Sequence, residues 1–99
     1  MAKYSKSEAL AKLKSLNGWR LEGEEIKKEY QFSSFSEAVK FVNGVADLAE
    51  RADHHPEILI NYRKVTLALS THDEGGITEK DFNLAEQIDS RIKQGEKQH

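Results

Sequence analysis

Cysteine is absent from the chain, and proline occurs once, at Pro56. Without thiols the protein can have no disulfide, no thiolate nucleophile and no sulfur ligand for zinc, so we expect packing alone to stabilise the fold. No apolar run approaches the roughly 20 residues that a membrane span needs, and residues 1–5 lack the apolar stretch of a signal peptide. We therefore expect a soluble, cytoplasmic protein that does not bind membranes.

An excess of basic charge is also missing, because the formal net charge is -2 at pH 7. Proteins that bind DNA or RNA directly usually carry a basic surface, so the composition disfavours direct nucleic-acid binding. A length of 99 residues fits a single domain, 1–99, which can bury a core but is too small for a deep cleft between domains. Any sizeable site is therefore expected to be shallow or shared between subunits.

Three segments carry apolar residues at helical spacing, and each begins with residues typical of a helix N-terminus. The predicted helices span residues 5–18, 34–51 and 78–94, and residues 94–99 are expected to fray. Gly44 lies inside the longest helix, where glycine costs about 1 kcal/mol relative to alanine. It either lets another helix approach closely or is tolerated on the exposed side. Thr78 and Asp81 are both candidates for capping the third helix.

Strand patterns occur in pairs between these helices. Residues 19–22 and 26–32 flank a Gly23-Glu24 turn, and residues 57–62 and 64–71 are rich in isoleucine, leucine, valine and tyrosine. Each pair is expected to form a hairpin, which gives the order α-β-β-α-β-β-α. We predict an α+β fold in which a four-stranded antiparallel sheet carries three helices on one face. Its free edges could pair with a second copy, so a homodimer or homotetramer is expected.

The histidines are concentrated in one part of the chain. His54 and His55 precede Pro56, His72 ends the last apolar run, and the fourth is the terminal His99. Histidine titrates near neutral pH, so proton chemistry is expected in this region. Pro56 disfavours helical angles at His55 and so places the end of the helix before it. In an antiparallel hairpin the start of one strand lies beside the end of the next, so His72 should lie near the histidine pair.

Three kinds of site would fit these imidazoles. Three histidines can bind a catalytic zinc ion, although adjacent histidines are an awkward way to aim two rings at one metal. Histidines at a helix C-terminus can also be favoured there by the helix dipole, without any function. The third possibility is metal-free general acid-base catalysis on a bound substrate. In that case Glu50 is expected to hold His54, and Asp53 could orient either ring.

One spaced pattern resembles the signature of the pterin-4a-carbinolamine dehydratases: Glu50-x3-His54-His55-Pro56-x5-Tyr62-x9-His72-x8-Asp81. The resemblance extends to Gly18-Trp19, to residues 32–35 and to residues 79–85, and so covers most of the chain. It implies a hydro-lyase that dehydrates 4a-hydroxytetrahydropterin to quinonoid dihydropterin and thereby recycles the cofactor of aromatic amino acid hydroxylases. It also implies that the substrate is a small-molecule pterin and that no metal or organic cofactor is needed.

The resemblance also implies roles for individual residues. The three matching histidines would line the pterin site as catalytic residues. Loss of hydroxide from C4a requires an acid for the departing oxygen and a base for the N5 proton. We expect His54 and His72 to supply these two groups and His55 mainly to bind and orient the substrate. Further residues expected to bind or orient the substrate are Glu50, Asp53, Pro56, Thr71 and Asp81, although helix capping is the first role expected of Asp81.

Other features concern binding rather than the acid-base set. Trp19 is expected in the core, and Tyr62 is expected to pack in the sheet rather than against a ligand. Ile58 stands where family members often carry an aromatic residue, which implies altered pterin affinity or side-chain preference. Some animal members bind a homeodomain transcription factor, which implies an alternative role as a partner-binding module along residues 36–51. A role in another pterin pathway, such as molybdopterin metabolism, is a further alternative.

Overall fold

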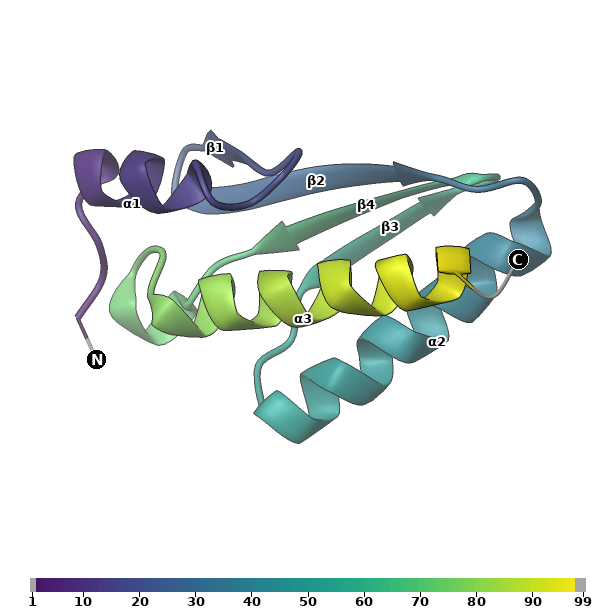
Figure 1. The fold of residues 1–99 in the computed structure, drawn as a ribbon. Helices are drawn as coiled ribbons and strands as arrows, with labels where there is room; N and C mark the ends of the chain where they lie inside the picture. The colour runs from purple at the N-terminus through teal and green to yellow at the C-terminus, as the bar shows by residue number, and fades with distance from the viewer. Residues whose placement is uncertain (1, 98–99) are drawn as a thin grey trace.

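A four-stranded antiparallel sheet forms one layer of the computed structural model, and helices form the other (Figure 1). The structure describes residues 2–97, with the side chains of residues 2–92. The elements are α1 (Lys6–Leu13), β1 (Arg20–Glu22), β2 (Glu25–Gln31), α2 (Phe35–Ala52), β3 (Glu57–Asn61), β4 (Lys64–Leu69), the short 3-10 helix η1 (His72–Glu74) and α3 (Glu79–Lys97). This order confirms the predicted α-β-β-α-β-β-α fold.

The two hairpins join through their inner strands, because the strands lie in the order β1-β2-β4-β3. Across this centre Ile26 pairs with Leu69, and Tyr30 pairs with Val65. Directly opposed residues lie on the same face of a sheet, and all four of these side chains are buried. The sheet therefore presents an apolar face at its centre, while β1 and β3 form its two edges.

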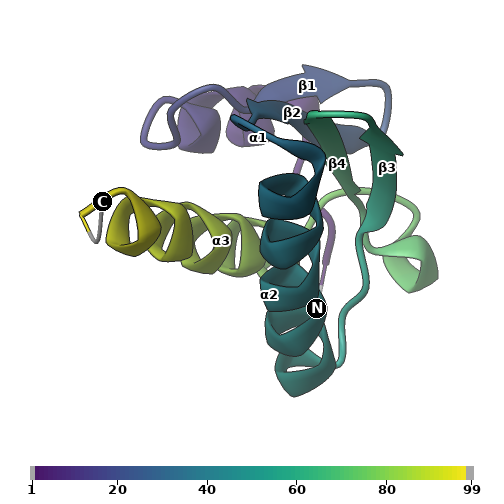
Figure 2. The same cartoon turned by 90° about the vertical axis from the view of Figure 1, so that its right-hand side faces the viewer.

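All three helices lie on one side of the curved sheet (Figure 2). Their buried faces supply much of the core: Ala9 and Leu13 from α1, Ala38, Phe41, Val45 and Ala49 from α2, and Phe82, Ala85 and Ile88 from α3. Gly44 of α2 lies under a side chain of α3, since a Cβ at this position would overlap the guanidinium of Arg91. The glycine therefore permits close approach of α3, the first of the two alternatives.

Among the described residues, no helix combines the length and apolar character that crossing a membrane requires.

Some element boundaries differ from those predicted. The capping box at Ser5 is confirmed, but α1 ends at Leu13 and the chain then continues through turns to Gly18. The helix α3 runs to Lys97, and residues 98–99 lie outside the described residues, so the fraying expected from residue 94 stays a prediction. Tyr62 does not pack in the sheet. It stands exposed in the β3–β4 turn with a φ of 55°, because a two-residue hairpin turn requires a left-handed backbone there.

The middle of α3 is fixed to the first hairpin by a carboxylate. Asp89 accepts hydrogen bonds from Trp19 Nε1 at 2.9 Å, from Lys28 Nζ at 3.0 Å and from the hydroxyl of Tyr30 at 2.8 Å. Burial, with the nearby Asp89 charge, raises the pKa of Tyr30 and keeps its hydroxyl a donor. Trp19 is buried, as predicted. These groups satisfy one another and serve to hold the helix on the sheet.

The start of α3 is fixed to the N-terminal segment, in what we term the Glu79 clamp (Tyr4, Lys12 and Glu79). The hydroxyl of Tyr4 donates to Glu79, and Lys12 Nζ lies 3.0 Å from the same carboxylate. The ring of Tyr4 meets Phe82 edge to face at 5.7 Å. The backbone N–H of Tyr4 donates to the carbonyl of Ile77 at 2.7 Å. The chain entering α3 is therefore held in place just before the residues that face the histidines.

Candidate active site

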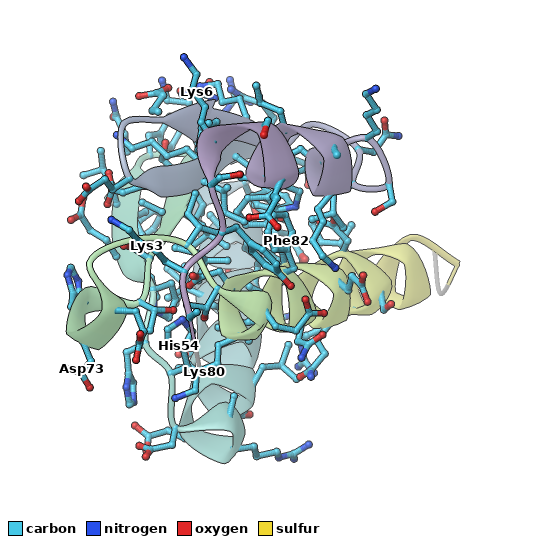
Figure 3. The ribbon with its side chains drawn as sticks, turned by 90° about the vertical axis from the view of Figure 1, so that its left-hand side faces the viewer. Lys3, Lys6, His54, Asp73, Lys80 and Phe82 are labelled. Atoms are coloured by element: carbon cyan, nitrogen blue, oxygen red, sulfur yellow. The ribbon has the colours of Figure 1, made fainter. Side chains whose placement is uncertain are left out.

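A hollow of about 250 Å³ lies where the α2–β3 loop, the end of β4 and the start of α3 meet. Figure 3 labels three residues of this hollow, His54, Asp73 on the η1 turn and Lys80 at the start of α3. The residues that line the hollow are Asp53, His54, His55, Ser70, Thr71, His72, Asp73 and Lys80. His72 therefore lines the same hollow as the histidine pair, as the hairpin argument predicted.

Larger hollows of about 460 and 700 Å³ occur elsewhere on the surface. The first lies between the N-terminal segment and the β1–β2 turn, and the second lies beside Asp89. Neither is lined by a histidine. Because proton transfer near pH 7 calls for imidazoles, the smaller hollow is the candidate active site in spite of its size.

The end of α2 directs the two neighbouring histidines to different sides. Asp53 adopts a left-handed conformation with φ 50° and ψ 44°, which aspartate tolerates better than most residues. Its N–H donates to the carbonyl of Glu50 at 3.2 Å, and the N–H of His54 donates to the carbonyl of Ala49 at 3.1 Å. This pair of bonds is a Schellman motif. It reverses the chain, and Pro56 then starts the path into β3 without lining the hollow itself.

His54 is turned inward, toward α3. Its side chain is 10% exposed, and Nε2 lies 2.5 Å from Oδ1 of the fully buried Asp81. The other carboxylate oxygen, Oδ2, accepts the hydroxyl of Thr71 and the backbone N–H of Thr78, each at 2.9 Å. A buried carboxylate is tolerable only with such partners. Asp81 therefore caps α3, as predicted, and also holds His54.

His55 is turned outward, toward solvent. Its Nε2 lies 3.3 Å from Oε1 of Glu50, and the two side chains are 58% and 77% exposed. The prediction that Glu50 holds His54 is therefore wrong. The helical spacing of four residues applied only if the helix continued, whereas the Schellman turn places His55 beside Glu50 instead. An exposed pair of this kind contributes about 0–1 kcal/mol, so it orients His55 weakly.

His72 lies across the hollow at the start of η1 and is exposed. The loop that carries it is closed by bonds between Thr71 and Gly76, whose backbone groups pair at 2.8 and 3.3 Å.

Lys80 also lines the hollow. Sequence reasoning missed Lys80, and its position next to Asp81 in the signature was the one signal that could have indicated it. In the described part of the chain, no three His, Asp or Glu side chains are grouped as ligands for a metal ion.

The arrangement brings together groups suited to proton transfer on a small, polar ligand. Three imidazoles reach one hollow from two segments of the chain, and one of them is backed by a buried carboxylate. Asp53 and Lys80 add a negative and a positive group at the rim. Imidazole backed by carboxylate is a common way to orient a proton acceptor.

The comparisons with known proteins agree with the residue pattern. The family model described as pterin 4 alpha carbinolamine dehydratase matches residues 2–91. A relative from Roseiflexus sp. (strain RS-1), provisionally named a pterin-4-alpha-carbinolamine dehydratase, is 54% identical over 87 residues, which cover 88% of this chain and 94% of that protein. A similarly named relative from Sulfolobus acidocaldarius is 43% identical over 86 residues, covering 87% and 94%. The chain belongs to the pterin-4a-carbinolamine dehydratase family.

Solved structures show the same fold. A Brucella melitensis protein described as a transcriptional coactivator/pterin dehydratase superposes with a TM-score of 0.84 at 37% identity, covering 89% of this chain and 96% of that one. A pterin dehydratase-like protein described as a RuBisCO assembly factor in the alpha-carboxysome gives a TM-score of 0.59 at 22% identity, covering 73% and 83%. The second likeness concerns the fold alone.

Proposed function

We propose that the protein is a 4a-hydroxytetrahydrobiopterin dehydratase, a hydro-lyase that converts 4a-hydroxytetrahydropterin to quinonoid dihydropterin and so recycles the tetrahydropterin cofactor. The observation that carries this proposal is the convergence of His54, His55 and His72 on one hollow, with Asp81 behind one of them. Membership of the family supports it. We propose that these side chains perform the reaction without a metal or organic cofactor.

The reaction requires two proton transfers. The bond between C4a and its hydroxyl oxygen breaks, the oxygen leaves as water after taking a proton from an acid, and the electrons of the N5–H bond form the N5=C4a double bond as a base takes that proton. Groups that titrate near the working pH serve best in both roles. His54 and His72 enter the hollow from different segments and are the proposed pair.

The remaining residues would bind and orient the pterin. His55 is exposed and loosely held by Glu50, which suits a binding role better than proton transfer. Asp53 lines the hollow and could meet the polar edge of the ring. Ile58 is partly buried against the core and does not line the hollow, so the altered pterin preference expected at this position stays a prediction.

A spectrophotometric dehydration assay with chemically generated 4a-hydroxytetrahydropterin tests the proposal. We expect His54→Ala and His72→Ala to lower kcat by about 100-fold or more, and His55→Ala to act mainly on KM. Gln87→Ala is a suitable control, because this exposed residue of α3 does not line the hollow. Dehydration rates that stay at the wild-type level in all three histidine variants would show that the catalytic proposal is wrong.

A partner-binding role is less well supported. The surface expected for it lay along α2, with Gly44 as the place where a partner helix could approach. That place is taken by Arg91 of the same chain. The coactivator description belongs to the Brucella melitensis protein and is not carried over to this chain.

A further inference from the structure

The hydrogen bonds behind His54 have a definite direction. A carboxylate can only accept, so the hydroxyl proton of Thr71 points at Oδ2 of Asp81, 2.9 Å away. Thr71 has no second hydroxyl proton. The contact of 2.8 Å between the hydroxyl oxygens of Thr71 and Thr78 must therefore be donated by Thr78. The Thr78 oxygen in turn accepts the backbone N–H of Lys80 at 3.3 Å.

This chain of hydrogen bonds ends at one carboxylate oxygen. Oδ2 of Asp81 receives the Thr71 hydroxyl and also the backbone N–H of Thr78 at 2.9 Å. All three side chains are buried, with Thr78 and Asp81 fully so. The carboxylate consequently cannot turn without breaking two bonds in a place where water does not replace them. Its second oxygen, Oδ1, is left facing His54 as an acceptor.

Asp81, which these bonds hold in place, fixes the tautomer of His54. An acceptor at Oδ1 requires the proton of neutral imidazole to be on Nε2, which leaves the lone pair on Nδ1. A ring with a lone pair on Nδ1 is a proton acceptor. When it takes a proton, the Asp81 carboxylate stabilises the imidazolium that forms, as an aspartate does behind the histidine of a serine protease. His72 lines the opposite side of the hollow at the start of η1.

We infer that Thr78 is a positioning residue of the active site and that the Thr78–Thr71–Asp81 chain makes Nδ1 of His54 the base of the reaction. Nδ1 takes the N5 proton, the electrons of the N5–H bond form N5=C4a, and imidazolium at His72 protonates the hydroxyl that leaves C4a as water. Solvent then returns the proton from His54 to His72. The assignment of base and acid rests on the proposed function, whereas the tautomer and its dependence on Thr78 do not.

The test uses nuclear magnetic resonance of the imidazole nitrogens in the substrate-free protein, together with dehydratase kinetics. In the wild type we expect the Nε2–H tautomer at His54 and a slowly exchanging Hε2 resonance. Thr78→Val removes the hydroxyl that donates to Thr71 but leaves both bonds to Oδ2. It is therefore expected to speed the exchange of that resonance and to lower kcat about tenfold, with KM changed less than about twofold. Thr78→Ser restores the hydroxyl and should restore both. Thr66→Val, on the outer face of β4, is the matched control and should change neither.

Thermal unfolding separates positioning from simple stabilisation. A Thr78→Val protein that is less stable but keeps the slow exchange of the Hε2 resonance and the wild-type kcat would overturn the inference. If Thr78→Val does not fold, Thr71→Val and Thr71→Ser provide the same comparison one bond closer to Asp81, with the same expected results. A wild type with the Nδ1–H tautomer would overturn it as well. A wild type that shows the expected resonance but no dehydration would contradict the proposed function alone.

Discussion

The chemistry of the site depends on which carboxylate meets which imidazole. Asp81 and Glu50 each contact one histidine, but Asp81 is fully buried and Glu50 is 77% exposed. A hydrogen bond to a buried charge is rigid and strong, whereas an exposed pair is screened by water. We therefore expect the two acidic residues to differ widely in their importance to catalysis.

Replacing each carboxylate by its amide tests this difference. Asp81→Asn keeps the size and can still accept the N–H of Thr78, but its amide can present a donor to His54 and so favour the wrong tautomer. We expect kcat to fall by about 100-fold or more, since the corresponding change in a serine protease costs about 10⁴-fold. Glu50→Gln, the matched control, should change kcat less than about threefold. Steady-state kinetics of the two variants test this difference. Similar losses of kcat in both variants would contradict the greater importance of Asp81.

The sequence predicted correctly that the histidines lie together, but not which carboxylate each one contacts. The hairpin argument placed His72 near His54 because a hairpin must bring its ends together. It could not show the left-handed turn at Asp53, because aspartate adopts such angles only where the surrounding fold demands them. Because of that turn, His54 contacts Asp81, 27 residues away, instead of Glu50, the partner expected four residues away.

At the scale of elements, the contact between α2 and α3 is governed by Gly44. Helical glycine costs about 1 kcal/mol relative to alanine, but here a Cβ would meet the far end of the Arg91 side chain. We expect Gly44→Ala to raise the free energy of unfolding by about 1 kcal/mol in an Arg91→Ala background. In the wild-type background the gain should be smaller, because Arg91 must move aside.

Urea unfolding of the four proteins measures this coupling as a double-mutant cycle. The outcome that would contradict the explanation is a destabilisation by Gly44→Ala of similar size in both backgrounds. The backbone of the helices, rather than Arg91, would then limit the space at this position.

The Glu79 clamp gives the fold a dependence on acid pH. Hydrogen bonds from Tyr4 and then Lys12 hold the pKa of Glu79 below its ordinary value of 4.5. The clamp therefore contributes fully to stability above about pH 4.5, and this contribution is lost as the pH falls through the lower pKa of the folded state. We expect the melting temperature of the wild type to fall more steeply below that pH than the melting temperature of Glu79→Gln.

Melting temperatures measured between about pH 3 and pH 7 for the two proteins test the clamp. Glu8→Gln serves as a control, since the pKa of Glu8 is also lowered, but by Ser5 at the N-cap of α1. Parallel curves for wild type and Glu79→Gln would contradict a role of Glu79 in joining the N-terminal segment to α3.

The helical and strand spacing of the apolar residues was visible in the sequence. The residues at which each helix or strand ends were harder to predict. Ser5 and Ser34 accept the predicted capping bonds at the starts of α1 and α2. The strand β4 ends at Leu69 rather than at Thr71, because Thr71 pairs with Gly76 in the loop that carries His72. Such loop closures depend on contacts made after the strands have formed, so apolar alternation alone does not reveal them.

For the whole molecule, the size of the hollow suggests that a single copy does not complete the site. Its volume of about 250 Å³ is below the range of about 300–1,000 Å³ that is usual for ligand pockets. The edge strand β3 begins at Glu57, just after the histidine pair, and exposes 60% of Leu59 and 37% of Ile60. An uncovered apolar edge of this kind readily pairs with another strand. We propose that a second copy pairs along β3 and helps to enclose the pterin.

Leu59→Lys tests both parts of this proposal. A charge on the edge strand should separate the copies, so light scattering is expected to show a monomer where the wild type shows a homodimer or homotetramer. Because the isolated hollow encloses less of the ligand, we also expect KM for the pterin to rise about tenfold. Leu10→Lys is the matched control, since Leu10 is an exposed leucine on α1. A monomeric Leu59→Lys protein with unchanged KM would show that one chain forms the whole site, and a monomeric wild type would contradict pairing along β3.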